Sequence, residues 1–491
     1  MKERTLHYSD FGAKGDGVND DFEAIVKTHA AANKDGLAVS SDNDAVYYIG
    51  GGNMTAEIQT DTNWGAAKFI IDDTHVKNRN SSVFKVTSRL EPIQVEGVRT
   101  LKKGQEQLGI DLPYDSLCVA LDDTTMRYIR EGLNQDSGTQ QTDVFIVQKD
   151  GQVDLNTQIL WDYDNITSLT ACPIDPKPLT ISGGHFTTIA NQETAEYKYF
   201  ARNIVITRSN VVVNGLTHVI TGELPTHGAP YGGFISIRNC ANITVDSCKL
   251  SGHKTYATIG AANKPVNMGT YDILVDRAVN LLFKDCTQLN DITDQTIWGI
   301  FGSNFTKNIT FDNVVFSRFD AHKGTVNPVI KDSVIGHMGV QLIGSGLCHI
   351  ENTKVTGYQF ANLRGDYGST WEGELIIKNC EFTPLRKSDA LVLDAYYTGL
   401  HDFGYACHMP RKITIDGLVI NDDKHEDGYQ GPRIISSLHS NYADELFNEK
   451  YPYALPEEVE IKNLTVKSGK AWRLSDNMRL FQGVRLGNED S

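Results

Sequence analysis

Residues 309–316 read ITFDNVVF, and this short stretch contains the pattern that decides the fold. Apolar and other residues alternate over its first four positions, a Gly, Asn, Asp or Ser stands at the fifth, and apolar residues then return. Alternation is typical of strands, and the fifth-position residue types tolerate a left-handed backbone, so each copy predicts two short strands joined by a tight bend. The ten copies are LTISGGHF (179–186), VVVNGLTH (211–218), ITVDSCKL (243–250), LLFKDCTQ (281–288), ITFDNVVF (309–316), PVIKDSVI (328–335), CHIENTKV (348–355), LIIKNCEF (375–382), ITIDGLVI (413–420) and VEIKNLTV (459–466).

The spacing of these copies predicts stacked coils. The shortest intervals between bends are 19 residues, from Asn313 to Asp332, and 20 residues, from Asp332 to Asn352. Three short strands and their turns fit such an interval, and the longer intervals leave room for loops. One coil cannot bury its own apolar face, but a stack of coils buries a continuous interior. We therefore predict an all-β chain whose residues 171–470 form a regular parallel β-helix, with small residues such as Cys248 stacked inside it.

The N-terminal segment YSDFGAKGDGVNDDFEAI (8–25) predicts a strand, a Gly-rich turn and then a helix. Asn19 can cap this helix, and acidic residues follow near its positive end. We expect residues 1–50 to close the open end of the core. Residues 51–170 predict irregular first coils with a β-rich insertion around 88–170, and residues 471–491 predict the closing segment at the other end.

Part of this sequence resembles a known superfamily. The motif DFGAKGDGVNDDFEAI (10–25) resembles the opening motif of polygalacturonases, pectate-lyase-like proteins and phage tailspike depolymerases, and the repeat is similar to their coil signature. The resemblance implies a single-stranded right-handed parallel β-helix of the pectin-lyase-like kind, and a carbohydrate as substrate. It does not select one reaction, because one fold supports several chemistries.

Composition excludes several other classes. The formal net charge of −16 and the lack of basic patches argue against a nucleic-acid partner, and they disfavour a polyanionic substrate unless a local basic cleft overrides the global sign. The eight cysteines form no CxxC pair or Cys/His cluster, so we expect buried thiols and no metal site.

No stretch has the roughly 18 apolar residues of a membrane span. We expect no membrane partner and a soluble chain, secreted or periplasmic if a leader has been removed and cytoplasmic otherwise. Nothing in the sequence indicates the oligomeric state.

The middle coils gather the best candidates for catalysis. Counting four and six residues past the last apolar position of each repeat places Asp320 and His322 on the outer surface, beside Asp291 and Asp294. Glycoside hydrolysis needs two carboxyl groups about 5–9.5 Å apart, and neighbouring coils are about 4.8 Å apart. We expect Asp320 as the acid, Asp291 or Asp294 as the base, and His322 as a group that tunes or shares the proton. Asp291 and Asp294 could instead satisfy loop amides.

Polygalacturonases have paired aspartates after the same type of repeat. Asp320 of FSRFDAHKG (316–324) matches the first of these aspartates, but Ala321 stands at the second position. The same count puts Gly339 and Gln359 in the column of Asp320.

A wider group of residues predicts a substrate-binding surface. Long loops on a rigid scaffold often carry function, aromatic rings stack on sugars, and Arg or Asp can hold hydroxyl or carboxylate groups. The residues are Lys254, His337, Gln341, Gln359, Arg364, Asp366, Trp371, Tyr397 and His401.

Three functions remain open. The leading hypothesis is a glycoside hydrolase without a cofactor. A polysaccharide lyase or epimerase is the alternative, in which Lys254, His322, Lys323 or Arg364 would serve as base or charge-neutralising group, with Ca²⁺ as a further option. The third is a noncatalytic glycan-binding or tailspike-like solenoid.

Overall fold

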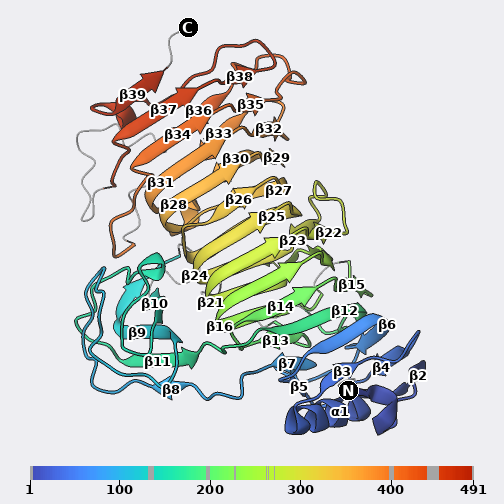
Figure 1. The fold of residues 1–491 in the computed structure, drawn as a ribbon. Coiled ribbons are helices and arrows are strands. Elements are labelled where there is room, and N and C mark those ends of the chain that lie inside the picture. The colour runs from blue at the N-terminus through green and yellow to red at the C-terminus, as the bar shows by residue number, and fades with distance from the viewer. Residues whose placement is uncertain are drawn as a thin grey trace. The chain divides into compact units, whose positions relative to one another are not determined.

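The computed structural model describes residues 4–130, 138–194, 199–225, 228–260, 263, 265–269, 271–396, 403–438 and 453–488 of the chain. The fold is a right-handed parallel β-helix with an N-terminal helix and a β-rich insertion, as the sequence predicts (Figure 1). The chain divides into two compact units. The first unit contains residues 1–121, 143–290 and 296–301, and the second contains residues 122–142, 291–295 and 302–491.

The predicted bends are present in every copy of the repeat. The fifth residue of each copy has a φ between 49° and 75°, the left-handed conformation that Gly, Asn and Asp adopt most readily. The position after the bend is buried in Cys248, Cys286, Ser333, Thr353 and Cys380. The bends and the interior stack of small side chains are therefore confirmed. The ten bend residues are Gly183, Gly215, Ser247, Asp285, Asn313, Asp332, Asn352, Asn379, Gly417 and Asn463.

In the first unit, coils stack through parallel strands that pair in register. β12 pairs with β6, β14 and β15, and β16 pairs with β13, β14 and β21. Two short antiparallel pairs, β18 with β23 and β19 with β20, accompany these coils. The strands are β1 (Thr5–His7), β2 (Asp16–Asp20), β3 (Ala38–Ser40), β4 (Val46–Ile49), β5 (Ala56–Ile58), β6 (Thr62–Asp72), β7 (Phe84–Val86), β12 (Leu179–Ile189), β13 (Ile204–Ile206), β14 (Val211–Asn214), β15 (Thr217–Thr221), β16 (Gly232–Asp246), β17 (Lys249–Leu250), β18 (His253–Lys254), β19 (Tyr256–Ile259), β20 (Pro265–Met268), β21 (Tyr271–Lys284), β22 (Thr287–Gln288) and β23 (Ile297–Gly299).

An aromatic core fills the first coils. Trp64 is fully buried and its Nε1 donates to the Tyr8 hydroxyl at 2.8 Å. The rings of Phe69 and Phe186 stack with their centroids 4.6 Å apart. The helix α1 (Phe22–Asp35) covers this core with one buried side, formed by Phe22, Ala24, Ile25, Thr28, His29 and Ala32.

The helix begins differently from the prediction. Its N-cap is Asp21 rather than Asn19. The Asp20 carboxylate accepts from the Phe22 backbone N–H at 3.0 Å, and the Asp21 carboxylate accepts from the Lys14 backbone N–H at 2.6 Å. The Gly-rich turn therefore folds back onto the start of the helix. No helix among the described residues combines the length and the apolar character that crossing a bilayer requires.

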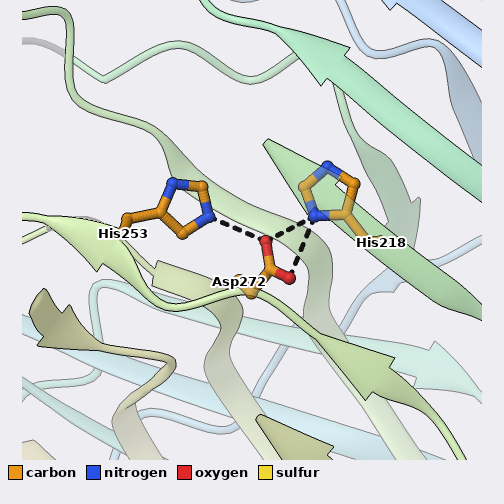
Figure 2. A group of neighbouring side chains, drawn as sticks. All are labelled: His218, His253 and Asp272. Carbon is orange, nitrogen blue, oxygen red and sulfur yellow. Dashed lines mark hydrogen bonds and ion pairs between the residues drawn. The ribbon is translucent and has the colours of Figure 1, made fainter. Parts of the chain in front are cut away.

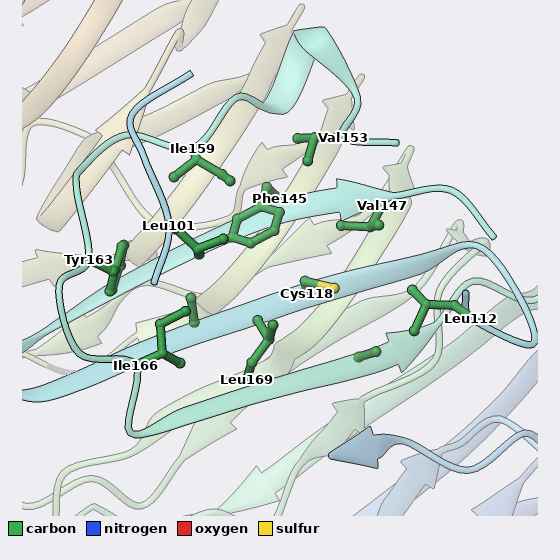
Figure 3. Packing of buried hydrophobic residues seen from close by; sticks show 12 residues of the cluster. Leu101, Leu112, Cys118, Phe145, Val147, Val153, Ile159, Tyr163, Ile166 and Leu169 are labelled. Atoms are coloured by element: carbon green, nitrogen blue, oxygen red, sulfur yellow. The ribbon is translucent and has the colours of Figure 1, made fainter. Parts of the chain in front are cut away.

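The insertion forms a separate antiparallel sheet with its own core. Strand order is β10–β9–β11–β8, and one face of the sheet buries the side chains that Figure 3 shows, among them Phe145, Cys118 and Leu169. On the other face, Leu117 packs in one cluster with Ala241 of the first-unit coils. The strands are β8 (Ile93–Gln94), β9 (Ser116–Arg127), β10 (Thr139–Val147) and β11 (Ser168–Pro173).

In the second unit, coils also stack through parallel strands that pair in register. β27 pairs with β25, β29 and β30, and β31 pairs with β28 and β34. The strands are β24 (Phe301–Asp312), β25 (Val315–Val326), β26 (Val329–Lys331), β27 (Val334–Gln341), β28 (Gly344–Glu351), β29 (Lys354–Gly357), β30 (Gln359–Asn362), β31 (Trp371–Lys378), β32 (Glu381–Pro384), β33 (Leu391–Asp394), β34 (Lys412–Asp416), β35 (Val419–Ile420), β36 (Arg433–Ile435), β37 (Glu458–Lys462), β38 (Thr465–Val466) and β39 (Arg485–Asn488).

Candidate functional site

A column of polar residues follows four successive strands of the second unit. Asp320 pairs with Gln341, Gln341 with Asn362, and Asn362 with Asp394. The residue before each of them is buried and apolar: Phe319, Val340, Ala361 and Leu393. Because side chains alternate along a strand, the polar residues face away from the interior. We call this set the outer column.

The predicted register of this column is wrong by two residues at Gly339 and by three at Gln359, because Gln341 and Asn362 occupy the column instead. Gly339, which was expected beside Asp320, pairs with Arg318 instead. The pairing shifts between Phe316 and Arg318, because the next coil has two more residues at this point. A shift of two residues keeps the same side of the strand, so Asp320 still faces outward but lies beside Gln341.

Asp320 is fully buried and contacts three cationic or imidazole groups. Its Oδ2 lies 2.7 Å from Arg318 Nη2 and 3.0 Å from His322 Nε2, and its Oδ1 lies 3.0 Å from Arg364 Nη1. Burial alone would raise the pKa of Asp320, but Arg318, His322 and Arg364 together hold it well below its usual range. These partners favour the ionised carboxylate, which argues against the predicted role of Asp320 as the acid.

Arg364 connects Asp320 to a second carboxylate. Its Nε and Nη2 donate to the two oxygens of Asp366 at 2.9 and 2.8 Å. Arg130 Nε reaches Asp366 at 2.6 Å, and the Tyr367 ring lies 5.1 Å from the Arg364 guanidinium and 5.6 Å from that of Arg130. Burial opposes the charge on Asp366, but the two arginines lower its pKa to about 2. We call Arg130, Arg318, Asp320, His322, Arg364 and Asp366 the Asp320 cluster.

His322 is the imidazole of the Asp320 cluster, and its side chain is 16% exposed. Burial lowers the pKa of His322 and outweighs the opposite effect of Asp320, so the ring is neutral at neutral pH. Its Nε2 faces the ionised Asp320 and must carry the ring proton in order to donate to it. The basic lone pair of the neutral ring is then on Nδ1.

The tip of the insertion belongs to the second unit and contributes Arg130. The neighbouring Tyr128 lies against Phe305, with ring centroids 6.0 Å apart, and a side chain at Gly324 would overlap the Tyr128 hydroxyl. The sequence of this segment contains no motif that would predict its role. Asp366, which pairs with Arg130, is more than 200 residues away from it in the chain, so only the fold brings the two residues together.

The loop of Asp291 and Asp294 belongs to the same unit, but Asp291 has a structural role. Its carboxylate accepts from the backbone N–H and the hydroxyl of Thr293, both at 2.8 Å, as in a loop that satisfies its own amides. Asp294 is half-buried, and its backbone N–H donates to the Asp291 carbonyl at 3.1 Å. The buried His337 donates its backbone N–H to the Ile292 carbonyl at 2.9 Å, which ties this loop to β27.

Other predicted binding residues have mixed outcomes. Trp371 is fully buried at the start of β31 and its Nε1 donates to the Gly346 carbonyl at 3.1 Å, so its prediction as a sugar-stacking residue is wrong. Gln341 is buried and donates to the Met338 carbonyl at 2.5 Å. Gln359 is half-buried in β30. The half-buried Lys254 lies in β18, which belongs to the first unit, whereas the Asp320 cluster belongs to the second unit. Tyr397 and His401 lie outside the described residues.

The first unit has a shallow groove of about 370 Å³ on its outer face. It crosses β1, β3, β6 and β12, and its lining includes His7, Ser40, Asp61, Asn63 and Ser182. Within the described part of the chain, one group of side chains has the types and spacing of metal ligands, and it also lies in the first unit. Neither place includes a residue of the Asp320 cluster.

No protein-family model and no curated protein sequence matches this chain. Among solved structures, the tailspike gp61 of Pseudomonas phage phi297 is similar, with a TM-score of 0.56, 12% identity, and coverage of 94% of this chain and 81% of that chain. The tailspike protein gp49 from Pseudomonas phage LKA1 has a TM-score of 0.50, 14% identity and coverage of 94% and 81%. At these identities the similarity shows the fold alone, which is a right-handed parallel β-helix.

Proposed function

We propose that this chain binds and cleaves a uronate-containing polysaccharide, and that His322 is the base that starts cleavage by β-elimination. One observation carries the proposal: a partly exposed, neutral imidazole is hydrogen-bonded to a buried, ionised Asp320 that also holds two arginines. Such an imidazole can accept a proton, and the carboxylate behind it stabilises the resulting cation.

The reaction needs one base and one group that neutralises the substrate carboxylate. In β-elimination the base removes the proton α to that carboxylate, the electron pair forms a C=C bond, and the bond to the leaving sugar oxygen breaks. His322 Nδ1 is the proton acceptor in this scheme. The departing oxygen then takes up a proton, which His322 can return.

The Asp320 cluster supplies the positive charge. It contains three guanidinium groups against two carboxylates, in a chain whose formal net charge is −16. Arg130 is the most exposed of the three arginines, with 32% of its side chain accessible, and its partner Asp366 is 31% exposed. Arginine binds carboxylates in bidentate fashion, so the cluster is the local basic site that an acidic polysaccharide requires.

An exposed aromatic ring stands beside the cluster. Tyr396 is 50% exposed, and its Cβ lies 3.0 Å from the position that a Cβ on Gly365 would occupy. Gly365 separates Arg364 from Asp366 in the chain. In this proposal the Tyr396 ring supports a sugar face next to the arginines.

We favour elimination over hydrolysis because Asp320 and Asp366 are held ionised and so cannot supply a proton. Asp394, in the same outer column, favours the second candidate, a glycoside hydrolase. Burial raises the pKa of Asp394, and a raised pKa is what a general acid needs. In that scheme Asp394 protonates the leaving oxygen, and a carboxylate such as Asp366 assists the attack of water.

The test is a product analysis on pectic, algal and bacterial capsular polysaccharides. Elimination gives products with the ultraviolet absorbance of an unsaturated uronate, whereas hydrolysis gives reducing ends without it. We expect the unsaturated product from the wild type and from Asp394→Asn, and no turnover from His322→Ala. Added Ca²⁺ leaves the rate unchanged, because the arginines provide the positive charge.

The matched control is His349→Ala, which removes a half-buried imidazole from β28 in the same unit. Reducing ends without absorbance, lost in Asp394→Asn, would replace elimination with hydrolysis. Binding without any product would leave a glycan-binding protein. The two solved structures described above are tailspikes, and we extend the proposal to a polysaccharide outside the cell.

A further inference from the structure

Two histidines and one aspartate meet in the interior of the first unit. His218 is in β15, His253 in β18 and Asp272 in β21, and none is more than 1% exposed. Figure 2 shows both imidazole rings turned toward the carboxylate. His218 Nδ1 lies 2.7 Å from Asp272 Oδ1 and 2.9 Å from Oδ2, and His253 Nε2 lies 2.8 Å from Oδ1.

The three side chains have the chemistry of a transition-metal site. Two imidazole nitrogens and one carboxylate oxygen form a donor set that Zn²⁺ and related ions accept, and these atoms lie within 4.8 Å of one another. The Ser251 backbone N–H donates to Asp272 Oδ2 at 2.8 Å, which orients the carboxylate.

An unsatisfied atom points to a ligand. Among the described residues, His253 Nδ1 is buried without a hydrogen-bond partner, and Glu223 Oε1 lies 3.8 Å from it. If a neutral His253 carries its proton on Nε2 for Asp272, then Nδ1 presents a bare lone pair to a carboxylate, which is unfavourable. If Nε2 instead binds a metal ion, Nδ1 carries the proton and faces Glu223. Metal-binding histidines commonly direct this second N–H at a carboxylate.

His218 is compatible with the same arrangement. Its Nε2 lies 3.0 Å from the Thr188 hydroxyl, which can accept the N–H that remains when Nδ1 binds an ion. The ring also stacks on Phe234, with centroids 3.7 Å apart, so its orientation is fixed.

We propose that His218, His253 and Asp272 bind a divalent transition-metal ion such as Zn²⁺. The ion replaces the protons shared between the carboxylate and the two rings. The ligand atoms then move from 2.7 and 2.8 Å apart to about 3.4 Å, the edge of a tetrahedron with bonds of about 2.1 Å. The site joins three separate strands of the first unit, so the bound ion stabilises that unit. It takes no part in the cleavage proposed for the second unit.

The first experiment uses the untagged full chain, stripped with a chelator and then loaded with Zn²⁺. We expect about one tightly held Zn²⁺ per chain after desalting, by elemental analysis. We also expect a thermal midpoint that rises with free Zn²⁺, because an ion that binds only the folded state stabilises it by mass action. Zinc that washes off, together with an unchanged midpoint, would overturn the proposal and leave a proton between the rings.

The second experiment compares variants. Asp272→Asn and His253→Gln should lose the tightly held ion and the shift of the midpoint. The matched control is His29→Gln, which removes another buried imidazole of the first unit and should keep both. Retention of zinc by Asp272→Asn would place the ion elsewhere.

Removing a buried charge can unfold a chain, so a third measurement uses the wild type alone. Co²⁺ held by imidazole and carboxylate ligands absorbs visible light, and Zn²⁺ should abolish these bands. Absence of the bands would contradict the site without reference to any variant.

Discussion

Asp320 has no contact with solvent, yet it is ionised, because Arg318 and Arg364 lie within hydrogen-bond distance of its oxygens. A buried charge is tolerated only with such partners. The arrangement also works in reverse, because the two arginines depend on the carboxylate for their own burial.

This dependence predicts a large stability loss in Asp320→Asn. The neutral amide leaves the charges of Arg318 and Arg364 unbalanced, and we expect the free energy of unfolding to fall by about 3–5 kcal/mol. Urea unfolding measures the change. The control is Asp332→Asn, the same substitution at an exposed bend on the next coil, where an effect of about 0.5 kcal/mol or less is expected. Equal losses in the two variants would contradict the buried network.

A second residue-scale prediction concerns pH. Burial lowers the pKa of His29 from 6.5 to about 3, so the folded chain keeps this ring neutral. Below pH 6.5 the unfolded chain binds a proton that the folded chain does not, so His29 makes stability fall with falling pH, by about 2 kcal/mol at pH 5. Unfolding of the wild type and of His29→Gln at pH 5 and 7.5 isolates this contribution. If the free energy of unfolding changed with pH by the same amount in the wild type and in the variant, the contribution of His29 would be ruled out.

Alternation within a strand was enough to predict that Asp320 and His322 face the same way. It could not reveal Arg130, whose partner Asp366 is distant in sequence, or the burial of Trp371, which depends on where β31 begins. The alternation along a strand predicts on which side of the strand a side chain lies, whereas its ion pairs and its burial depend on neighbouring coils and loops.

At the scale of the element, bends are the feature that the sequence predicts best, because a left-handed φ restricts the residue type. Bends with the same φ still differ in their surroundings. A Cβ on Gly183 would lie 2.7 Å from the Gly65 nitrogen, whereas a Cβ on Gly215 would meet nothing within 4 Å.

We therefore predict opposite tolerance at two equivalent bends. Gly215→Asn should change the free energy of unfolding by about 0.5 kcal/mol or less, since Asn occupies this position in other copies. Gly183→Asn should lower the free energy of unfolding by about 1–3 kcal/mol, because the new side chain would overpack against the backbone of Gly65. Denaturant midpoints check the difference, and equal tolerance would mean that neighbouring coils approach less closely than described.

The tip of the insertion is the element that the sequence could not assign. We predict that Arg130→Ala lowers kcat/KM for the polysaccharide about tenfold or more and lowers kcat itself, because Arg130 neutralises the carboxylate beside the carbon that loses its proton. Arg127→Ala, on the same insertion, is the control, since Arg127 contacts Gln141 within the insertion at 2.9 Å. A higher KM with an unchanged kcat would instead limit Arg130 to substrate binding.

At the scale of the molecule, repetition made the fold predictable: ten copies of one short pattern leave few alternatives to a solenoid. The same regularity limits prediction of function. Every coil offers an outward face, and only loops and the insertion distinguish one part of that face from another. The Asp320 cluster is set apart by the arginines that these segments bring to it.

The most direct measurement is a crystal structure of the His322→Ala variant with an oligosaccharide of the substrate. We predict that the sugar lies against the exposed edge of the Asp320 cluster, with its carboxylate within hydrogen-bond distance of Arg130. An oligosaccharide bound instead in the first-unit groove beside Asp61 and Asn63, with the Asp320 cluster unchanged, would contradict it.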